Sequence, residues 1–417
     1  MNRRFRGIIG CRSRREADHY ASKSMDATNL KRCSMNFRYS ISGRSIGVVL
    51  GWLFCCSAIP GAHADSSISA NQMATAATSF IETLDASQRE AALFALDTDE
   101  RASWSNLPIV MFEPSGLLIR DMSDEQRKAT HALLRASMSS QGYAKVAGVM
   151  WLDDVLGEIE QAAIDGETGV SNTQYRQAMA DSRGSGNYAV AIFGNPGDGD
   201  WGWKLAGHHL AVNFTVSGDR VGFTPTFLGS SPMAIDSGRY SGRMVLSHEG
   251  ERGIQLMQSL SKSQQQTAII APELARDIFE GPGRRASLAK FEGLKADELS
   301  SRQLQLLQIL VREYLGNVDH DAAAAQLSLI EAHGWGELWF SWRGPVDIAE
   351  KFYYRVHGPR LLIEYNRQNA NHDHSIMRDP ANDYGEDWLA EHYKENHPTL
   401  EQAIRDTRRR VEDQHSH

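Results

Sequence analysis

Two histidines separated by one residue, His372 and His374, lie in a segment rich in side chains that bind metals or anions. In an extended chain alternate side chains point the same way, so both imidazoles can reach one metal ion. A second pair, His208-His209, lies in another strand-like stretch. Three histidine nitrogens with positions left for water or substrate are the ligand pattern of catalytic zinc and non-haem iron sites. The sequence therefore predicts a metal site built on a sheet.

Only one member of the second pair is expected to reach the metal. If residues 203–216 form one strand, His208 shares the apolar face and His209 the polar face. The choice between them stays open at this point. The alternative interpretation is one hydrogen-bonded core histidine beside one surface histidine.

Acidic and basic residues near the His-x-His motif supply further candidates. Glu364, on the preceding strand-like run, or Asp373 can act as a carboxylate ligand or base. Arg378 can orient an anionic group, and Asp379 follows it as a further catalytic candidate. The spacing of the two histidines alone is not specific, and the alternative is a polar loop that caps a sheet.

Trp201 and Trp203 follow a glycine-rich segment, residues 195–200, and are predicted to bind substrate from a loop over a pocket. A purely structural role for these tryptophans is the alternative. The segment lacks the ending of a phosphate-binding loop and the spacing of an EF-hand. No serine-hydrolase elbow, HExxH helix or dinucleotide fingerprint occurs, so no nucleotide cofactor is predicted.

The N-terminus reads as a targeting segment. Residues 46–60 form an apolar run of signal-peptide length, and the A-x-A sequence at 62–64 predicts cleavage after Ala64. Residues 1–34 make the leader unusually long, so Met35 is the expected true start. No second apolar run is long enough to span a membrane. We therefore expect an exported protein, periplasmic or secreted through a Sec-type signal, with no membrane attachment after cleavage.

The charge and the cysteine content exclude some classes of partner and of site chemistry. Removing residues 1–64 leaves 33 basic and 49 acidic residues (44 minus 11 and 52 minus 3), a net charge of −16. Such an acidic chain argues against nucleic acid or an anionic membrane as partner. Cys11, Cys33, Cys55 and Cys56 all precede the cleavage site, so the mature chain has no disulfide and no cysteine ligand.

The pattern of elements predicts one α+β domain over residues 65–417, with its core at about 71–395. Apolar spacing predicts helices over 71–96, 143–161 and parts of 247–314, and capping boxes at Ser87 and Ser123. Period-two patterns predict an antiparallel sheet of hairpins, packed with the helical blocks, from residues 188–193, 203–228 and 337–365. A polar helix is expected at 387–412. No internal repeat is evident.

Both histidine motifs lie in stretches that resemble the DUF3500 family, a domain of unknown function. The resemblance rests on residues 201–215 (WGWKLAGHHLAVNFT), 224–229 (TPTFLG), 353–365 (YYRVHGPRLLIEY) and 371–379 (NHDHSIMRD), and covers almost the whole mature chain. It implies no activity. It does imply that the two histidine pairs belong to one shared site. The family pattern has an apolar residue where this chain has Asp373.

Three hypotheses follow. The first is a metalloenzyme that acts on a small molecule by hydrolysis or metal-dependent oxidation, with zinc, copper or iron bound. The second is a non-catalytic periplasmic copper- or zinc-binding protein, and the third is a metal-free module for a small acidic ligand. An open coordination position beside a pocket would favour the enzyme, and a closed or exposed cluster would favour metal carriage. Neither the substrate nor the oligomeric state follows from the sequence.

Overall fold

The computed structural model describes residues 66–166, 173–369 and 371–396, all within one compact unit. The predicted signal peptide, the cysteines and the tail beyond residue 396 lie outside these ranges. Among the helices in these ranges, none has the length and apolarity needed to cross a bilayer.

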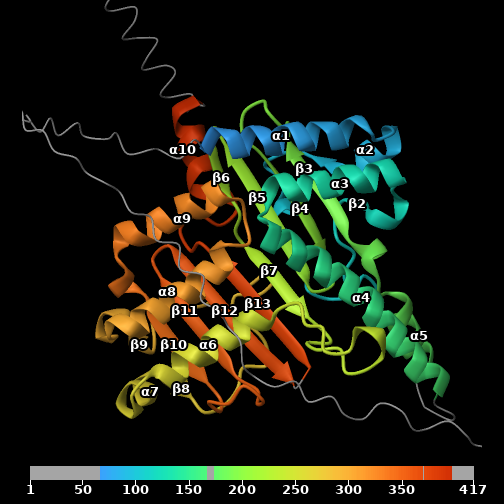
Figure 1. Ribbon diagram of the computed structural model, residues 1–417. Helices are drawn as coiled ribbons and strands as arrows, with labels where there is room; N and C mark the ends of the chain where they lie inside the picture. The colour runs from blue at the N-terminus through green and yellow to red at the C-terminus, as the bar shows by residue number, and fades with distance from the viewer. Residues whose placement is uncertain (1–65, 167–172, 370, 397–417) are drawn as a thin grey trace, which may run out of the picture. The chain divides into compact units, whose positions relative to one another are not determined.

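A mixed 13-stranded sheet with helices packed on it confirms the α+β prediction (Figure 1). The main strand order is β1-β3-β4-β5-β7-β13-β12-β11-β10-β8, and only the β1–β3 and β8–β10 pairs are parallel. The strands are β1 (Leu93–Phe94), β2 (Leu117–Leu118), β3 (Ala189–Gly194), β4 (Trp201–Gly207), β5 (Leu210–Ser217), β6 (Arg220–Gly222), β7 (Thr226–Ser230), β8 (Ile269–Ala271), β9 (Leu294–Lys295), β10 (Trp339–Arg343), β11 (Tyr353–Gly358), β12 (Leu361–Asn369) and β13 (His372–Arg378). The helices are α1 (Ser66–Glu82), α2 (Ala86–Ala92), α3 (Asp124–Ser137), α4 (Ser140–Gly166), α5 (Thr173–Asp181), α6 (Ser247–Ser259), α7 (Lys262–Ala268), α8 (Ser301–Leu315), α9 (His320–His333) and α10 (Glu386–Asn396).

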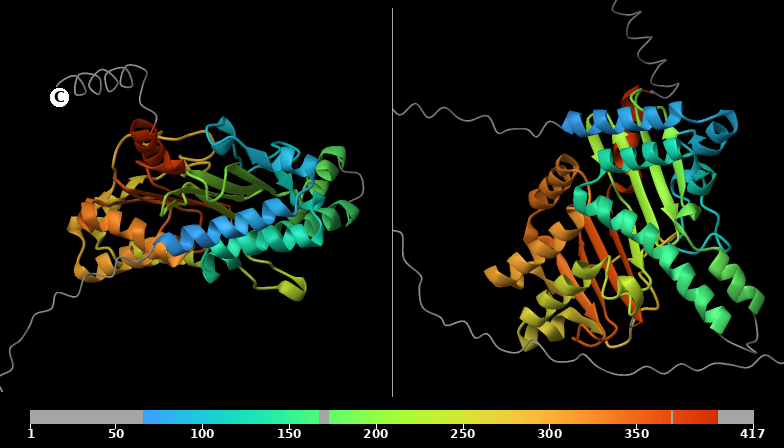
Figure 2. Two further views of the ribbon diagram at one scale, coloured as in Figure 1. Left: turned by 90° about the horizontal axis from the view of Figure 1, so that it is seen from above. Right: turned by 45° about the vertical axis from the view of Figure 1, so that its right-hand side comes forward.

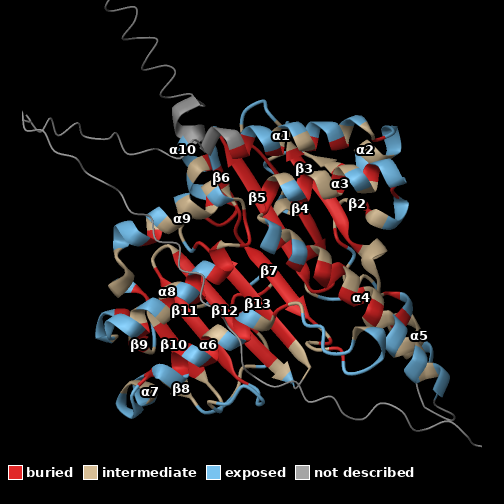
Figure 3. Ribbon diagram, in the orientation of Figure 1, coloured by how far each residue is buried: buried red, intermediate tan, exposed pale blue. Residues whose placement is uncertain are grey.

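The two faces of the sheet have different covers. Seen from above (Figure 2, left), α1, α3 and α4 lie along one side of the sheet with the helices of the second half, and we call this side the helix face. Its side chains join the largest apolar cluster, to which β5 contributes Leu210 and Val212. The opposite side, the loop face, carries a smaller cluster in which Phe227 and Ile376 meet Ile278. The strands are buried almost throughout, while the helices expose their outer sides (Figure 3).

The sheet consists of two halves of like topology, a structural repeat that was not evident in the sequence. The strand order reads the same from either end once β1, β3, β4 and β5 are matched with β8, β10, β11 and β12. At the centre β7 pairs with β13 in antiparallel fashion, which relates the halves by an approximate two-fold axis. The strand registers of the two halves agree too. The pair Trp203–Phe214 in the first half matches the pair Tyr354–Tyr365 in the second. By the same register, the pair Trp201–Val216 matches positions Phe352 and Arg367.

The repeat is visible in the sequence once the structure aligns it. Residues 203–214 (WKLAGHHLAVNF) correspond to residues 354–365 (YRVHGPRLLIEY), with apolar, glycine and cationic positions in common. Few residues are identical between the two segments, which hides this correspondence from inspection. The sequence signal that survives is the buried alternation of the strands around the shared glycine.

The capping boxes at the helix N-termini repeat in the same way. The box predicted at Ser123 is confirmed: Ser123 accepts from the amide of Gln126, whose side chain accepts from the Ser123 amide. Its counterpart is Ser300 with Gln303 at α8. The box predicted at Ser87 is wrong, because Asp85 caps α2 instead. Asp85 ends the α1–α2 connection in an extended conformation, as an N-cap requires.

The stretch predicted as one strand over 203–216 is two strands joined by a two-residue turn. His208 and His209 form that turn, and His209 has φ +60°. The chain reverses here, so the alternation argument does not decide which histidine faces the metal. Trp201 and Trp203 lie in β4 and are fully buried, so the prediction of loop-borne aromatics is wrong. Trp203 stacks on Phe214, with ring centroids 4.9 Å apart.

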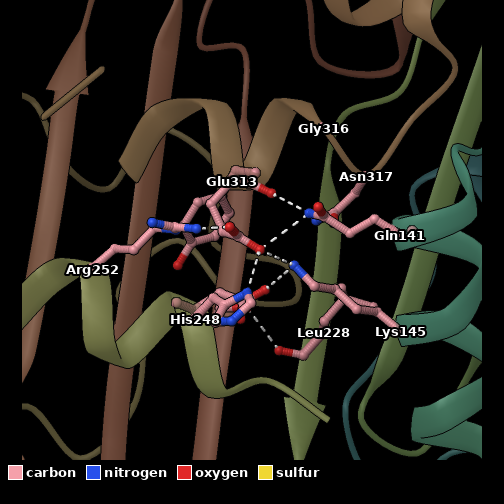
Figure 4. Close-up of polar contacts among 12 residues, drawn as sticks. Gln141, Lys145, Leu228, His248, Arg252, Glu313, Gly316 and Asn317 are labelled. Carbon is pink, nitrogen blue, oxygen red and sulfur yellow. Dashed lines mark hydrogen bonds and ion pairs between the residues drawn. The ribbon is translucent and has the colours of Figure 1, made fainter. Parts of the chain in front are cut away.

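A buried ionic network ties the helices of the two halves together (Figure 4). The Lys145 ammonium on α4 lies 2.7 Å from Glu249 on α6 and 2.8 Å from Glu313 on α8. Arg252 also binds Glu313, at 2.8 Å. Burial raises the pKa of Glu249, which has one oxygen without a described partner. Burial acts on Glu313 in the same direction, but the hydrogen bonds from Lys145 and Arg252 outweigh it and lower the pKa of Glu313.

Replacing Lys145 with Met should lower the free energy of unfolding by about 3–5 kcal/mol, because two buried carboxylates lose their shared cation. Chemical denaturation measures this. Lys128→Met, at an exposed position of α3, is the control and should change little. Adding Glu249→Gln to Lys145→Met should recover part of the loss. A loss below about 1 kcal/mol for Lys145→Met would contradict the proposed role of the network.

Replacing Trp203 with Ala should lower the free energy of unfolding by about 3–5 kcal/mol, since the change leaves a cavity in the core. The matched control is Trp388→Ala, because Trp388 is only partly buried and its indole lies under Arg220. Urea unfolding of both variants measures the difference. Equal stability of Trp203→Ala and the parent would support the substrate-binding role instead.

Candidate metal centre

Three imidazole nitrogens converge on the loop face of the sheet. The Nε2 atom of His372 lies 2.9 Å from Nε2 of His209 and 2.9 Å from Nε2 of His374. All three ligand atoms lie within 4.8 Å of one another, so they can share one ion. The structure therefore selects three of the four histidines predicted as ligands.

The sheet brings these residues together from distant parts of the sequence. His374 is directly opposite Gly229 in the β7–β13 pair, and the Gly229 amide donates to the carbonyl of His209 at 2.7 Å. A Cβ atom on residue 229 would lie 3.1 Å from the His209 ring. Glycine thus lets the ring lie close over β7. The turn between β4 and β5 then directs His209 toward the start of β13.

A carboxylate fixes the orientation of His374. Its Nδ1 atom lies 2.7 Å from an Asp277 oxygen. A proton on Nδ1 donates to Asp277 and leaves the Nε2 lone pair facing the other two histidines. This carboxylate–histidine arrangement is typical of metal-ligating histidines, whose second nitrogen is held by an acceptor. Burial raises the pKa of Asp277, but the hydrogen bond and charge of His374 outweigh it and lower this pKa.

Burial favours the neutral form of His209 and His372. It lowers the pKa of His209 well below its usual value, and neighbouring histidines act in the same direction. The pKa of His372 falls to about 3, chiefly through burial and then through the charge of His374. Metals bind the neutral form of histidine, so these two residues are in the state that metal binding needs.

His208 lies behind the cluster rather than in it. Its ring stacks on that of His209, with centroids 3.7 Å apart. Its Nδ1 lies 2.6 Å from Asp153, and its Nε2 lies 3.1 Å from the Arg183 guanidinium. These contacts use both ring nitrogens. The open choice between the two adjacent histidines is thus resolved for His209.

The remaining predicted residues have other partners. Glu364 and Arg378 lie on the loop face with the histidines, but both bind backbone groups of residues 279–281. Glu364 also accepts from Tyr353, and Arg378 also donates to Asp383. Asp379 accepts from Arg360 and Gln326. Asp373 points to the helix face, where it bonds Tyr365 and Arg367. The catalytic roles of Glu364, Arg378 and Asp379 stay predictions, and these contacts point to support of the surrounding chain.

Asp277 was missed by the sequence reasoning, as were Asp153 and Arg183. Asp277 lies in an irregular stretch between β8 and β9, where no periodicity marks it. Asp153 lies on α4, where the sequence pattern indicates only an apolar helix face. The available signal was indirect: a metal-bound histidine needs an acceptor for its second nitrogen.

The matching family model covers residues 66–386 and is described as a protein of unknown function, DUF3500. The chain belongs to the DUF3500 family. The resemblance noted from the two histidine motifs is thereby confirmed. No curated protein and no solved structure matches the chain.

A cleft of about 580 Å³ has Asn371, the chain neighbour of His372, in its lining. It is lined by the outer part of α4, by residues 231–240, and by Asn369 and Asn371. Asn371 directly precedes His372, the only partly exposed member of the three. None of the three histidines lines the cleft, so Asn371 is its link to the cluster along the chain.

His357 is a buried histidine of the loop face outside the cluster. Its ring packs edge-on against Phe291, with centroids 4.6 Å apart. Burial, and then the charge of Arg355, lowers the pKa of His357 to about 4. An unfolded histidine has a pKa near 6.5, so the unfolded chain binds the proton more readily. The stability that depends on neutral His357 is therefore present above about pH 6.5 and is lost as the pH falls toward 4.

His357→Gln should reduce the acid sensitivity of folding. The difference between the urea midpoints at pH 7 and pH 4.5, measured with a chelator present, should be smaller in the variant than in the parent. His320→Gln, on the fully exposed His320, serves as control and should leave that difference unchanged. An unaltered difference in His357→Gln would show that this histidine does not titrate in the stated range.

Proposed function

We propose that the chain is a metal-dependent enzyme, hydrolase-type, in which His209, His372 and His374 hold one divalent transition-metal ion. The observation that carries the proposal is the convergence of three Nε2 atoms with Asp277 on the far side of His374. With its proton on Nδ1 toward Asp277, His374 presents a bare Nε2 lone pair, and a proton on Nε2 of His372 could be donated to only one of its two neighbours. A cation at that point satisfies all three.

Three protein ligands fit a catalytic site better than a structural one. Structural zinc sites are closed by four protein ligands, whereas catalytic sites keep a position for water. No fourth histidine or carboxylate joins the group among the residues that the structure describes. Bound water would have its pKa lowered to about 7 and could attack an electrophilic carbon or phosphorus, with the leaving group taking up a proton. Iron or copper in the same ligand set would support oxidation.

The surroundings favour a small molecule as substrate. A cleft of about 580 Å³ falls in the size range of small-molecule sites, and its lining includes Asn371, which precedes His372 in the chain. Its lining combines apolar side chains with polar ones such as Asn369 and Asn371. The predicted signal peptide supports action in the periplasm or outside the cell.

The test is metal content and affinity. Protein depleted with a chelator and then reconstituted with zinc, cobalt, iron or copper should bind one ion per chain. The variants His209→Ala, His372→Ala and His374→Ala should each weaken binding by at least about 100-fold, since each removes a direct ligand where even a supporting residue is worth about 10- to 100-fold. His357→Ala is the matched control, a buried histidine of the same face, and should keep parental affinity.

A second measurement separates the enzyme from a metal carrier. Azide added to the cobalt form should change its visible spectrum, because an open position accepts the anion. A spectrum insensitive to azide would favour copper or zinc carriage. Failure of the parent to bind any of the four metals would leave only a metal-free ligand-binding module.

A further inference from the structure

We propose that Glu364 and Arg378 are positioning residues that hold the segment 275–281 over the sheet, so that Asp277 fixes the ring of His374. The inference rests on the proposed metal centre for its functional meaning. It assigns a different role to two residues that the sequence predicts to be catalytic. Residues 275–281 are called the strap below.

Glu364 binds the strap through its backbone amides. The residue is fully buried on β12. One carboxylate oxygen accepts from the amide of Phe279 at 2.7 Å, and the other accepts from the amide of Glu280 at 2.7 Å. The Tyr353 hydroxyl donates to the same carboxylate at 2.7 Å. Both oxygens are therefore used to hold consecutive peptide groups in place.

Arg378 complements this by donating to strap carbonyls. Its Nε atom donates to the carbonyl of Glu280 at 2.8 Å, while Nη1 donates to Asp383 at 2.6 Å. On the other side of Asp277, the amide of Asn366 donates to the carbonyl of Ala275 at 3.1 Å. The chain is thus fastened two residues before Asp277 and again two and three residues after it. The Asp277 carboxylate has little freedom to leave His374.

The first half of the molecule offers an internal comparison. By strand register, Asn213 occupies the place of Glu364, and Phe227 occupies the place of Arg378. Asn213 donates to the carbonyl of Pro225, within the sheet region itself. The first half anchors its covering segment through a cation, because the buried Lys204 ammonium donates to the carbonyls of Glu100 and Ser103, each at 2.6 Å. The half whose segment faces His374 instead uses a buried carboxylate that accepts from backbone amides.

The need for such anchoring follows from the position of Asp277 outside regular structure. Between β8 and β9 the chain has no helix or strand to fix it. A histidine ligand must be held within about 0.5 Å of its working position, and this precision comes from the groups behind it. Burying a carboxylate is costly unless hydrogen bonds compensate, which suits a residue kept for its geometry.

A double-mutant cycle tests the proposal. Glu364→Gln keeps the shape but places a donor amide against a donor N–H, so the strap should loosen. Zinc affinity, measured by competition with a chelating dye, should fall by about 10- to 100-fold in Asp277→Asn and in Glu364→Gln. Because Glu364 acts through Asp277, the double variant should bind zinc no more weakly than Asp277→Asn alone.

Hydrogen exchange supplies a readout that needs no metal. In metal-free protein, Glu364→Gln should speed exchange of the amides of Phe279 and Glu280. Glu249→Gln is the matched control: this second fully buried glutamate is anchored to Lys145 in the helix network, so its change should affect stability but neither zinc affinity nor exchange in the strap.

Three results would overturn the inference: parental zinc affinity in Glu364→Gln, multiplied losses in the double variant, or unchanged exchange at Phe279 and Glu280. If the parent binds no zinc, cobalt, iron or copper, the proposed function fails. The exchange measurement then still decides whether Glu364 holds the strap.

Discussion

The antiparallel pairing of β7 with β13 is the contact on which the rest of the molecule depends. It joins two sheet halves of like topology into one sheet, and it sets residues 226–230 beside residues 373–377. Through it, a hairpin of the first half and a strand of the second meet, although His209 and His372 are 163 positions apart in the chain. A shift of one residue in this register would turn His374 to the other face of the sheet. The geometry of the candidate metal centre therefore depends on the interface between the halves.

The scaffold is duplicated, but the chemistry is not. His209 at the first hairpin corresponds to Arg360 at the second, where the guanidinium binds Asp379. The same backbone position thus carries a histidine of the candidate metal centre in one half and a member of an ion pair in the other. The molecule shows how one architecture supports a site by side-chain choice alone, since fold and site are separable properties.

Sequence reasoning reached the local features and missed the long-range ones. The His-x-His motif was legible because alternation in an extended strand is a local rule, and His372 and His374 do share a face. The choice between His208 and His209 could not be predicted, because it depends on a chain reversal. In that reversal His209 adopts a positive φ, which non-glycine residues seldom do. Trp201 and Trp203 were misjudged for a similar reason: the turn formers before them indicate a loop, but the loop ends at Asp200 and β4 begins with Trp201. Asp277 could not be found at all, since its importance comes only from what lies opposite it. The repeat escaped notice because its halves share pattern rather than residues.

The ends of the sheet have a consequence for how the protein behaves in a crowded compartment. The outermost strands, β1 and β8, have two and three residues, and each pairs in parallel with its longer neighbour. An open sheet of this width presents two edges, and a long flat edge is a template on which another chain can add a strand. Strands this short expose few unpaired peptide groups. Each half of the sheet therefore ends in a short edge strand, which discourages end-to-end stacking of molecules into fibres.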